Sequence, residues 1–155
     1  MKIFDLPRVA IIGKEGLCTR GQNAAPGLWA EANAHFAEVA DLGMKDPDGS
    51  YTGFWGAMSD KGRNFLPWED DFTTGLYLAG VEVPENAQAP EGWAKWVLPA
   101  RRYLAVEVEP ERYADIFAET LRSLPERHLR LAGAVCDFTD PGTGKSSLFF
   151  PVEDA

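Results

Sequence analysis

The stretch Gly75-Leu-Tyr-Leu-Ala-Gly-Val-Glu-Val83 decides how the rest of the chain is interpreted. Its side chains alternate, with Tyr77 and Val81 on one side and Gly80 and Glu82 on the other. A period of two is typical of a half-buried strand. The second side combines a carboxylate with a glycine, and a glycine within a strand often marks a close approach by a ligand or another backbone. We therefore predict a strand over 75–83 with one face near a binding site.

Strand and helix signals come in the same order before and after a connector rich in Pro and Gly, which separates two halves of the chain. The first half predicts a strand over 6–13, a helix from Pro26 to Gly43, and strands over 51–58 and 75–83. The second half predicts a strand over 103–108, a helix over 110–124, and strands over 131–138 and 147–152. The pattern indicates one domain over 1–155 with half-repeats at roughly 1–84 and 95–155.

This order of elements predicts an α+β fold of duplicated β-α-β-β units related by a pseudo-twofold axis. One amphipathic helix per half covers only one face of an antiparallel sheet. We expect both helices on one side of the sheet and a ligand groove on the other side, near Gly53, Gly56, Gly80 and Glu82. A concave aromatic face with one or two acids is typical of a small-molecule site.

Composition excludes several classes of protein. A net charge of −9 with dispersed basic residues argues against direct binding of nucleic acid. No apolar run is long enough to span a membrane, and the N-terminus lacks the features of a signal peptide. Cys18 and Cys136 match neither a disulfide framework nor a zinc site. The sequence predicts a reduced, cytoplasmic protein without a membrane or nucleic-acid partner.

Two short motifs invite functional interpretations that the sequence does not support. The run 142–147 has a glycine-rich beginning, but Thr139 stands where a phosphate-binding loop needs glycine, so we predict a hairpin turn. His35 and His128 have no metal-ligand partners in sequence. We predict neither a metal nor a cofactor.

Two acids are the candidate catalytic or ligand-binding groups. Glu82 is predicted to be a strand residue that pairs with a cation or polarises a water, the alternative being a solvent-facing side chain. Asp137 is predicted to lie in the first strand after the second helix, the alternative being a residue at the end of a hairpin. An alternating pattern shifted by one residue would exchange the faces, so the sequence does not decide which acid faces the groove.

Aromatic residues are the candidate walls of the site, because rings bind cations and flat ligands by quadrupole and stacking forces. Trp55, beside Gly56, is the first candidate, and Trp96 is another. Trp68 lies in a loop that could act as a lid. Tyr103 is either a lining hydroxyl or a core residue, whereas a helical stripe predicts that Trp29 belongs to the core.

Five segments, taken in order over nearly the whole chain, resemble the gyrase-inhibitor-like (GyrI-like) small-molecule-binding superfamily, which includes the effector-binding domains of multidrug-responsive transcription activators. They are Leu6-Pro-Arg-Val-Ala-Ile-Ile-Gly13, Leu28-Trp29, Tyr77-Leu-Ala-Gly-Val-Glu-Val83, Leu98-Pro-Ala-Arg-Arg-Tyr-Leu-Ala-Val106 and Leu148-Phe-Phe-Pro-Val152. The resemblance implies a duplicated fold that binds flat, often cationic, lipophilic compounds between its halves. It also implies a pocket acid in a pattern like Glu-x-Tyr-Asp-Pro. Here Asp137 stands in place of that glutamate and Thr139 in place of the tyrosine.

These observations predict a stand-alone protein, monomeric or homodimeric, that captures planar lipophilic compounds, cations among them. One alternative, implied by the resemblance, is a hydrolase of strained or activated xenobiotics of the cyclopropanoid type. In it Glu82 or Asp137 would direct a water. Another is a protein-interaction module such as a gyrase inhibitor.

Overall fold

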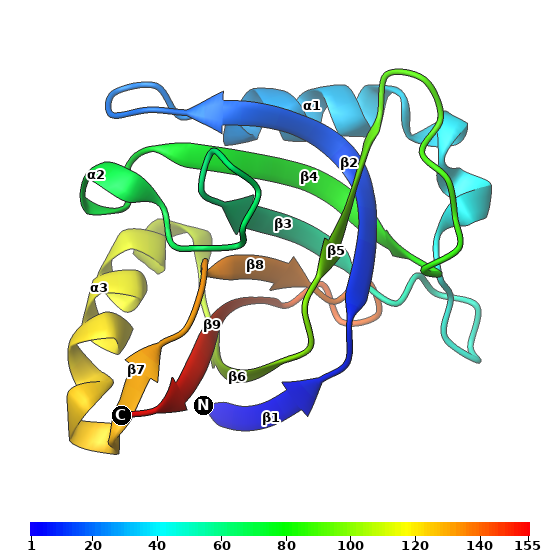
Figure 1. Ribbon diagram of the computed structural model, residues 1–155. Helices are drawn as coiled ribbons and strands as arrows, with labels where there is room; N and C mark the ends of the chain where they lie inside the picture. Colours follow the sequence, from blue (N-terminus) through cyan, green and yellow to red (C-terminus); the bar gives the residue numbers. More distant parts are fainter.

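The computed structural model describes all residues, 1–155, and contains one large sheet with helices on one side (Figure 1). The strands are β1 (Lys2–Leu6), β2 (Val9–Cys18), β3 (Phe54–Ser59), β4 (Gly75–Val83), β5 (Ala94–Leu98), β6 (Arg101–Glu107), β7 (Leu129–Leu131), β8 (Cys136–Thr139) and β9 (Ser146–Asp154). The helices are α1 (Ala25–Ala34), α2 (Glu69–Phe72) and α3 (Tyr113–Ser123). Short 3₁₀ turns are η1 (Phe36–Glu38), η2 (Ala40–Leu42), η3 (Pro110–Arg112) and η4 (Pro125–Arg127).

The strands pair antiparallel in the order β1-β6-β9-β8-β3-β4-β2-β5, and β7 adds to β9. One block, β2-α1-β3-β4, and a second, β6-α3-β8-β9, have the same element order, so the predicted duplication is confirmed. The blocks meet where β3 pairs with β8. At this seam Trp55 lies opposite Phe138, and Gly56 lies opposite Asp137.

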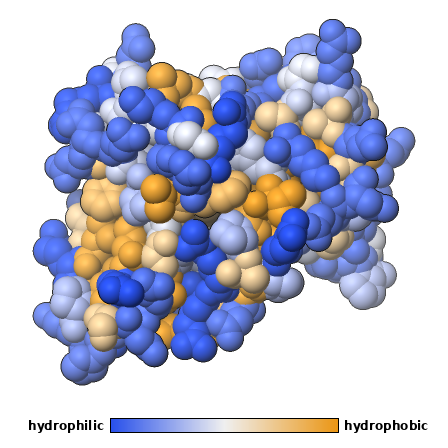
Figure 2. Space-filling model, in the orientation of Figure 1, coloured by the Kyte–Doolittle hydropathy of each residue, from blue (hydrophilic) through white to orange (hydrophobic).

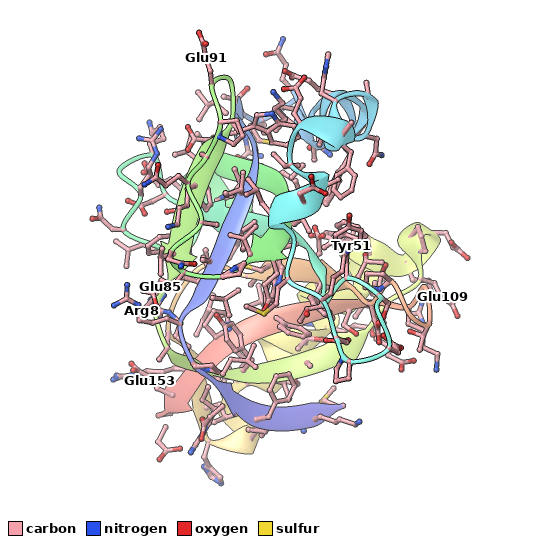
Figure 3. All side chains as sticks on the ribbon, turned by 90° about the vertical axis from the view of Figure 1, so that its right-hand side faces the viewer. Arg8, Tyr51, Glu85, Glu91, Glu109 and Glu153 are labelled. Atoms are coloured by element: carbon pink, nitrogen blue, oxygen red, sulfur yellow. The ribbon has the colours of Figure 1, made fainter.

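The two blocks exchange their outer strands, which the sequence analysis did not predict. β1 precedes the first block but pairs with β6, Ile3 lying opposite Leu104. β5 precedes the second block but pairs with β2, Trp96 lying opposite Ile11. The linker before β2 and the connector after β4 come together where Arg8 forms an ion pair with Glu85 (Figure 3).

Both helices lie on the same side of the sheet, as predicted. α1 packs against β2 and β4, and Ala32 and Tyr77 belong to the cluster beneath it. The helix ends at Ala34, earlier than expected, and the chain reaches Gly43 through η1 and η2. α3 covers the second block, where Phe117 packs on Phe150.

The sheet face opposite the helices differs from the expected open groove. Trp55 is 1% exposed, and its ring contacts Phe138 and Phe149 with centroid separations of 5.0 and 5.3 Å. The loop after β3 adds Phe65, whose ring packs edge-on against Trp96. Aromatic side chains from both blocks therefore fill this face at the seam, and the loop after β3 adds a further ring to it.

The predicted strand 131–138 is interrupted in the structure. β7 ends at Leu131 and β8 begins at Cys136. In the gap, the Ala134 N–H donates to the Phe65 carbonyl oxygen at 3.0 Å. The loop after β3 therefore accepts a hydrogen bond that a continuous strand would give to a neighbouring strand.

Candidate functional site

Asp137 lies on β8 with its carboxyl group on the helix side of the sheet, where β4 and α1 bring two aromatic side chains to it. The Tyr77 hydroxyl donates to Asp137 Oδ2 at 2.9 Å, and Trp29 Nε1 donates to the Tyr77 hydroxyl, also at 2.9 Å. An indole N–H can only donate a hydrogen bond. Trp29 therefore fixes the direction of both hydrogen bonds, and the Tyr77 hydroxyl donates its proton to the Asp137 carboxylate.

Gly56 provides the space for this cluster. A Cβ atom at Gly56 would lie 2.0 Å from the Tyr77 hydroxyl oxygen and 2.3 Å from Asp137 Oδ1. Gly56 is also the cross-strand partner of Asp137 at the seam. Any side chain there would displace the carboxyl, the phenol or both, so the site depends on a glycine at this position.

The cluster shifts the acidity of its own members. Burial raises the pKa of Asp137 to about 6, although hydrogen bonds from Tyr77 and the Gly56 backbone lower it in part. With that pKa the carboxyl group is roughly nine-tenths ionised at neutral pH. Burial also raises the pKa of Tyr77 and of Tyr113, so both remain protonated donors.

No basic side chain neutralises this carboxylate. Asp137 takes part in none of the ion pairs of the structure, which join other acids to Arg, Lys and His side chains. The cavity beside it is lined by no Lys or Arg. A buried negative charge is expensive unless it is paired, and the structure supplies no counter-charge for Asp137.

A cavity of about 570 Å³ opens beside Asp137, between the first turns of α1 and α3. Its lining includes Asn23, Ala25, Pro26, Trp29, Met58, Trp68, Tyr77, Val108, Pro110, Tyr113, Asp137 and Ser146. Four of these are aromatic, and Asp137 is the only charged residue among them. The cavity therefore combines one carboxyl group with an aromatic wall, and aromatic rings in general attract cations and stack on flat groups.

Of the predicted residues, Trp68 also reaches this cavity. Its ring lies directly over Gly75, where a Cβ atom would come within 2.1 Å of it. Trp68 Nε1 donates to the Leu76 carbonyl oxygen at 3.0 Å, which holds the ring against β4. The α2 turn that follows is left-handed at Asp70 and Asp71 (φ 52° and 57°), and Arg20 binds the Asp70 carboxylate.

Glu82 lies on the opposite face of the sheet from Asp137. It accepts a hydrogen bond from Trp55 Nε1 at 2.8 Å, and burial raises its pKa, while the Trp55 bond lowers it in part. Trp55 belongs to the aromatic cluster on that face. The two acids are therefore separated by the sheet and do not act on one ligand.

The remaining two predicted residues also lie on Glu82's side of the sheet. Tyr103 is 2% exposed within the aromatic cluster. Trp96 Nε1 donates to Glu15 Oε1 at 2.7 Å, and Glu15 is in turn paired with Arg63. The structure thus brings Trp68 and Asp137 together, and it places Trp55, Trp96, Tyr103 and Glu82 away from them.

Three aromatic residues of the cavity were not predicted as site residues, namely Trp29, Tyr77 and Tyr113. Trp29 and Tyr77 follow helix and strand periodicities, so both resemble ordinary core residues. Tyr77 did carry a signal, because the other residues on its side of β4 are Ala79, Val81 and Val83. A single phenol on such a face needs a hydrogen-bond partner when it is buried, and that partner is Asp137.

The structure contains no group of three or more His, Cys, Asp or Glu side chains arranged to hold a metal. None of its helices has the length and apolar character needed to cross a bilayer.

Comparisons with known proteins identify the fold. No protein-family model and no curated protein sequence matches the chain. Among solved structures, SAV2435 bound to tetraphenylphosphonium has a TM-score of 0.67 at 16% identity, covering 98% of this chain and 93% of that one. A putative bacterial transcription regulation protein from Staphylococcus aureus MU50 has a TM-score of 0.66 at 15% identity, with coverage of 98% and 97%. The EcmrR C-terminal domain has a TM-score of 0.62 at 12% identity, with coverage of 99% and 97%. Agreement over whole chains, together with the duplicated β-α-β-β plan, gives this protein the GyrI-like fold.

Proposed function

We propose that this protein binds a small lipophilic cation in the cavity between α1 and α3, with its positive charge at Asp137. The observation that carries the proposal is a half-buried carboxyl group that lines the cavity, lacks a basic partner and is surrounded by aromatic side chains. A bound cation would replace the missing counter-ion. It would also contact the faces of Trp29, Trp68 or Tyr113, which attract cations.

One of the comparison structures contains a small-molecule ligand. SAV2435 was solved with tetraphenylphosphonium, a lipophilic cation, and its fold matches this chain along nearly its full length. Its sequence identity is 16%, so the argument for this chain rests on the chain's own residues. Those residues are the carboxyl of Asp137 and the hydrogen-bonded pair that positions it, Tyr77 and Trp29.

The test is a titration of tryptophan fluorescence at pH 7.5 with tetraphenylphosphonium and a panel of flat cationic dyes. The titration compares the unmodified protein with the variants Asp137→Asn and Glu82→Gln. Burial raises the pKa of both acids, but only Asp137 lines the cavity. We expect saturable quenching that weakens at least tenfold in Asp137→Asn and changes less than twofold in Glu82→Gln. Equal affinity in all three proteins would contradict the proposal.

Mass spectrometry of the recovered compounds separates binding from turnover. A pKa of about 6 also suits a general base, so hydrolysis by Asp137 is the second candidate function. We expect the compounds to return unchanged. Time-dependent cleavage that disappears in Asp137→Asn would replace the binding proposal with the hydrolase.

A further inference from the structure

A second cavity of about 490 Å³ lies next to the one beside Asp137, and the two share the lining residues Met58, Trp68 and Tyr113. The second cavity extends along α3 toward α2. Its other lining residues are Asp71, Phe72, Ala114, Phe117, Ala118, Leu121, Arg122 and Val135. In Figure 2, apolar residues gather on the surface between α2 and α3. The shared residues place a cavity with a charged group and a mainly apolar cavity side by side, and together we call them the groove.

The two ends of the groove differ in chemistry. The first contains the ionised carboxyl of Asp137 and the hydroxyl of Tyr113. In the second, only Asp71 and Arg122 are charged, and both are exposed. The interior of the second cavity therefore offers a ligand apolar contact alone, mainly from Phe72, Phe117 and Leu121.

We propose that the preferred ligand is an elongated amphiphile, with an ammonium group at Asp137 and an unbranched apolar tail along α3. This inference rests on the proposed function, because it assigns the charged end to the same carboxyl. It adds a second binding site, for the tail, and it distinguishes a long-chain amine from a compact aromatic cation. Phe72 supports the assignment, because 37% of its side chain is exposed at the groove and a tail would cover it.

The tail site makes a quantitative prediction about a homologous series of ligands. Burial of each methylene group in an open apolar groove should strengthen binding about two- to fourfold. Primary n-alkylamines from butylamine to decylamine, measured by calorimetry on the full chain at pH 7.5 below their micelle concentrations, should show this increase until the groove is filled. Matching n-alkanols should show the same dependence on length with weaker affinity throughout.

Ala118→Phe tests where the tail lies, since Ala118 lines only the second cavity. In this variant butylamine should bind as before, while the increase with chain length should be lost. Ala30→Phe is the matched control, because Ala30 is an exposed alanine on α1 that lines neither cavity. If circular dichroism shows that Ala118→Phe is misfolded, Ala114→Leu, at an exposed position of the same wall, replaces it.

The outcomes separate this inference from the proposed function. Affinity that is independent of chain length, or a length dependence that Ala118→Phe leaves intact, would overturn the tail site while the cation site stands. If butylamine and tetraphenylphosphonium both bind with no dependence on Asp137, the cation site falls. If no compound of either series binds, both proposals fall together.

Discussion

Glu82 and Asp137 are two half-buried acids on opposite faces of one sheet, and they differ in what surrounds them. Each accepts a hydrogen bond from an aromatic side chain, Trp55 at 2.8 Å for Glu82 and Tyr77 at 2.9 Å for Asp137. Burial raises the pKa of both. Beside Glu82 the Trp55 ring fills the space, whereas beside Asp137 a cavity of about 570 Å³ is open.

The difference teaches that a perturbed carboxyl group does not by itself identify a binding site. On the Glu82 face, rings from both blocks meet and pack with each other. On the Asp137 face, the first turns of α1 and α3 stand apart, and Gly56 beneath them adds no side chain. A candidate site needs the acid and also unoccupied space into which the acid points.

The largest expected effect comes from filling the space that Gly56 leaves. Gly56→Ala should destabilise the fold by about 3 kcal/mol, because the new Cβ overlaps Tyr77 and Asp137, and it should abolish cation binding. Chemical denaturation and the fluorescence titration measure the two effects. Gly27→Ala is the control, since a Cβ there meets nothing within 4 Å, and helix propensity should make this variant slightly more stable. If Gly56→Ala bound the cation normally, Tyr77 and Asp137 would be able to move away from the new Cβ atom without loss of the binding site.

Asp137→Asn should increase stability at alkaline pH by about 2 kcal/mol, somewhat less than the full pKa shift is worth. The folded-state pKa, about 6, lies above the ordinary value of 3.8, so the ionised form destabilises the fold above pH 6. That cost disappears as the pH falls toward 4 and the folded protein takes up the proton. Unfolding curves at pH 8 and pH 4 measure it. Glu82→Gln is the control and should also increase stability, without affecting ligand binding. If Asp137→Asn were still more stable than the unmodified protein at pH 4, titration of Asp137 could not be the cause.

The affinity for tetraphenylphosphonium should follow the ionisation of Asp137. The ligand does not titrate, so affinity should be constant above pH 7 and fall by up to about tenfold per pH unit below the pKa of about 6. Titrations between pH 5 and pH 8 measure this profile. Glu82→Gln should keep it and Asp137→Asn should lack it. If the affinity of the unmodified protein did not change with pH, the ligand would not bind at the Asp137 carboxyl group.

Trp29→Phe should have the smallest effect, about 1 kcal/mol of stability, since it removes one hydrogen bond to the Tyr77 hydroxyl. Without that donor Tyr77 becomes a weaker donor itself, so the pKa of Asp137 should rise, as measured by carbon NMR of the carboxyl group. Trp93→Phe, which removes a bond to Glu38, is the control and should leave this pKa unchanged. If the pKa of Asp137 were unchanged in Trp29→Phe, Trp29 would contribute only packing and would not affect the acidity of Asp137.

The sequence predicted the elements that local patterns specify. The alternation of β4 over Gly75–Val83 and the apolar stripe of α3 both correspond to observed elements. Asp137 and Trp68 were also named as site residues in advance, and both line the cavity.

What the sequence did not predict depends on contacts between distant segments. The exchange of β1 and β5 is decided by pairing across the two blocks, and neither strand contains a local signal for its partner. The groove was expected on the face opposite the helices, but there the rings of both blocks pack together. That packing depends on the pairing of β3 with β8, which brings Trp55 opposite Phe138. The alternation of one strand does not show which of its faces a distant segment will fill.

The exchanged outer strands have a consequence for how the chain holds together. The connector over 84–93 is the only covalent link between the blocks, yet β1 of the first block completes the sheet of the second, and β5 of the second completes the sheet of the first. If the chain were cut within that connector, the strand pairs β1–β6, β2–β5 and β3–β8 would still join the two fragments. We therefore expect the two fragments to stay together and to unfold in one cooperative step.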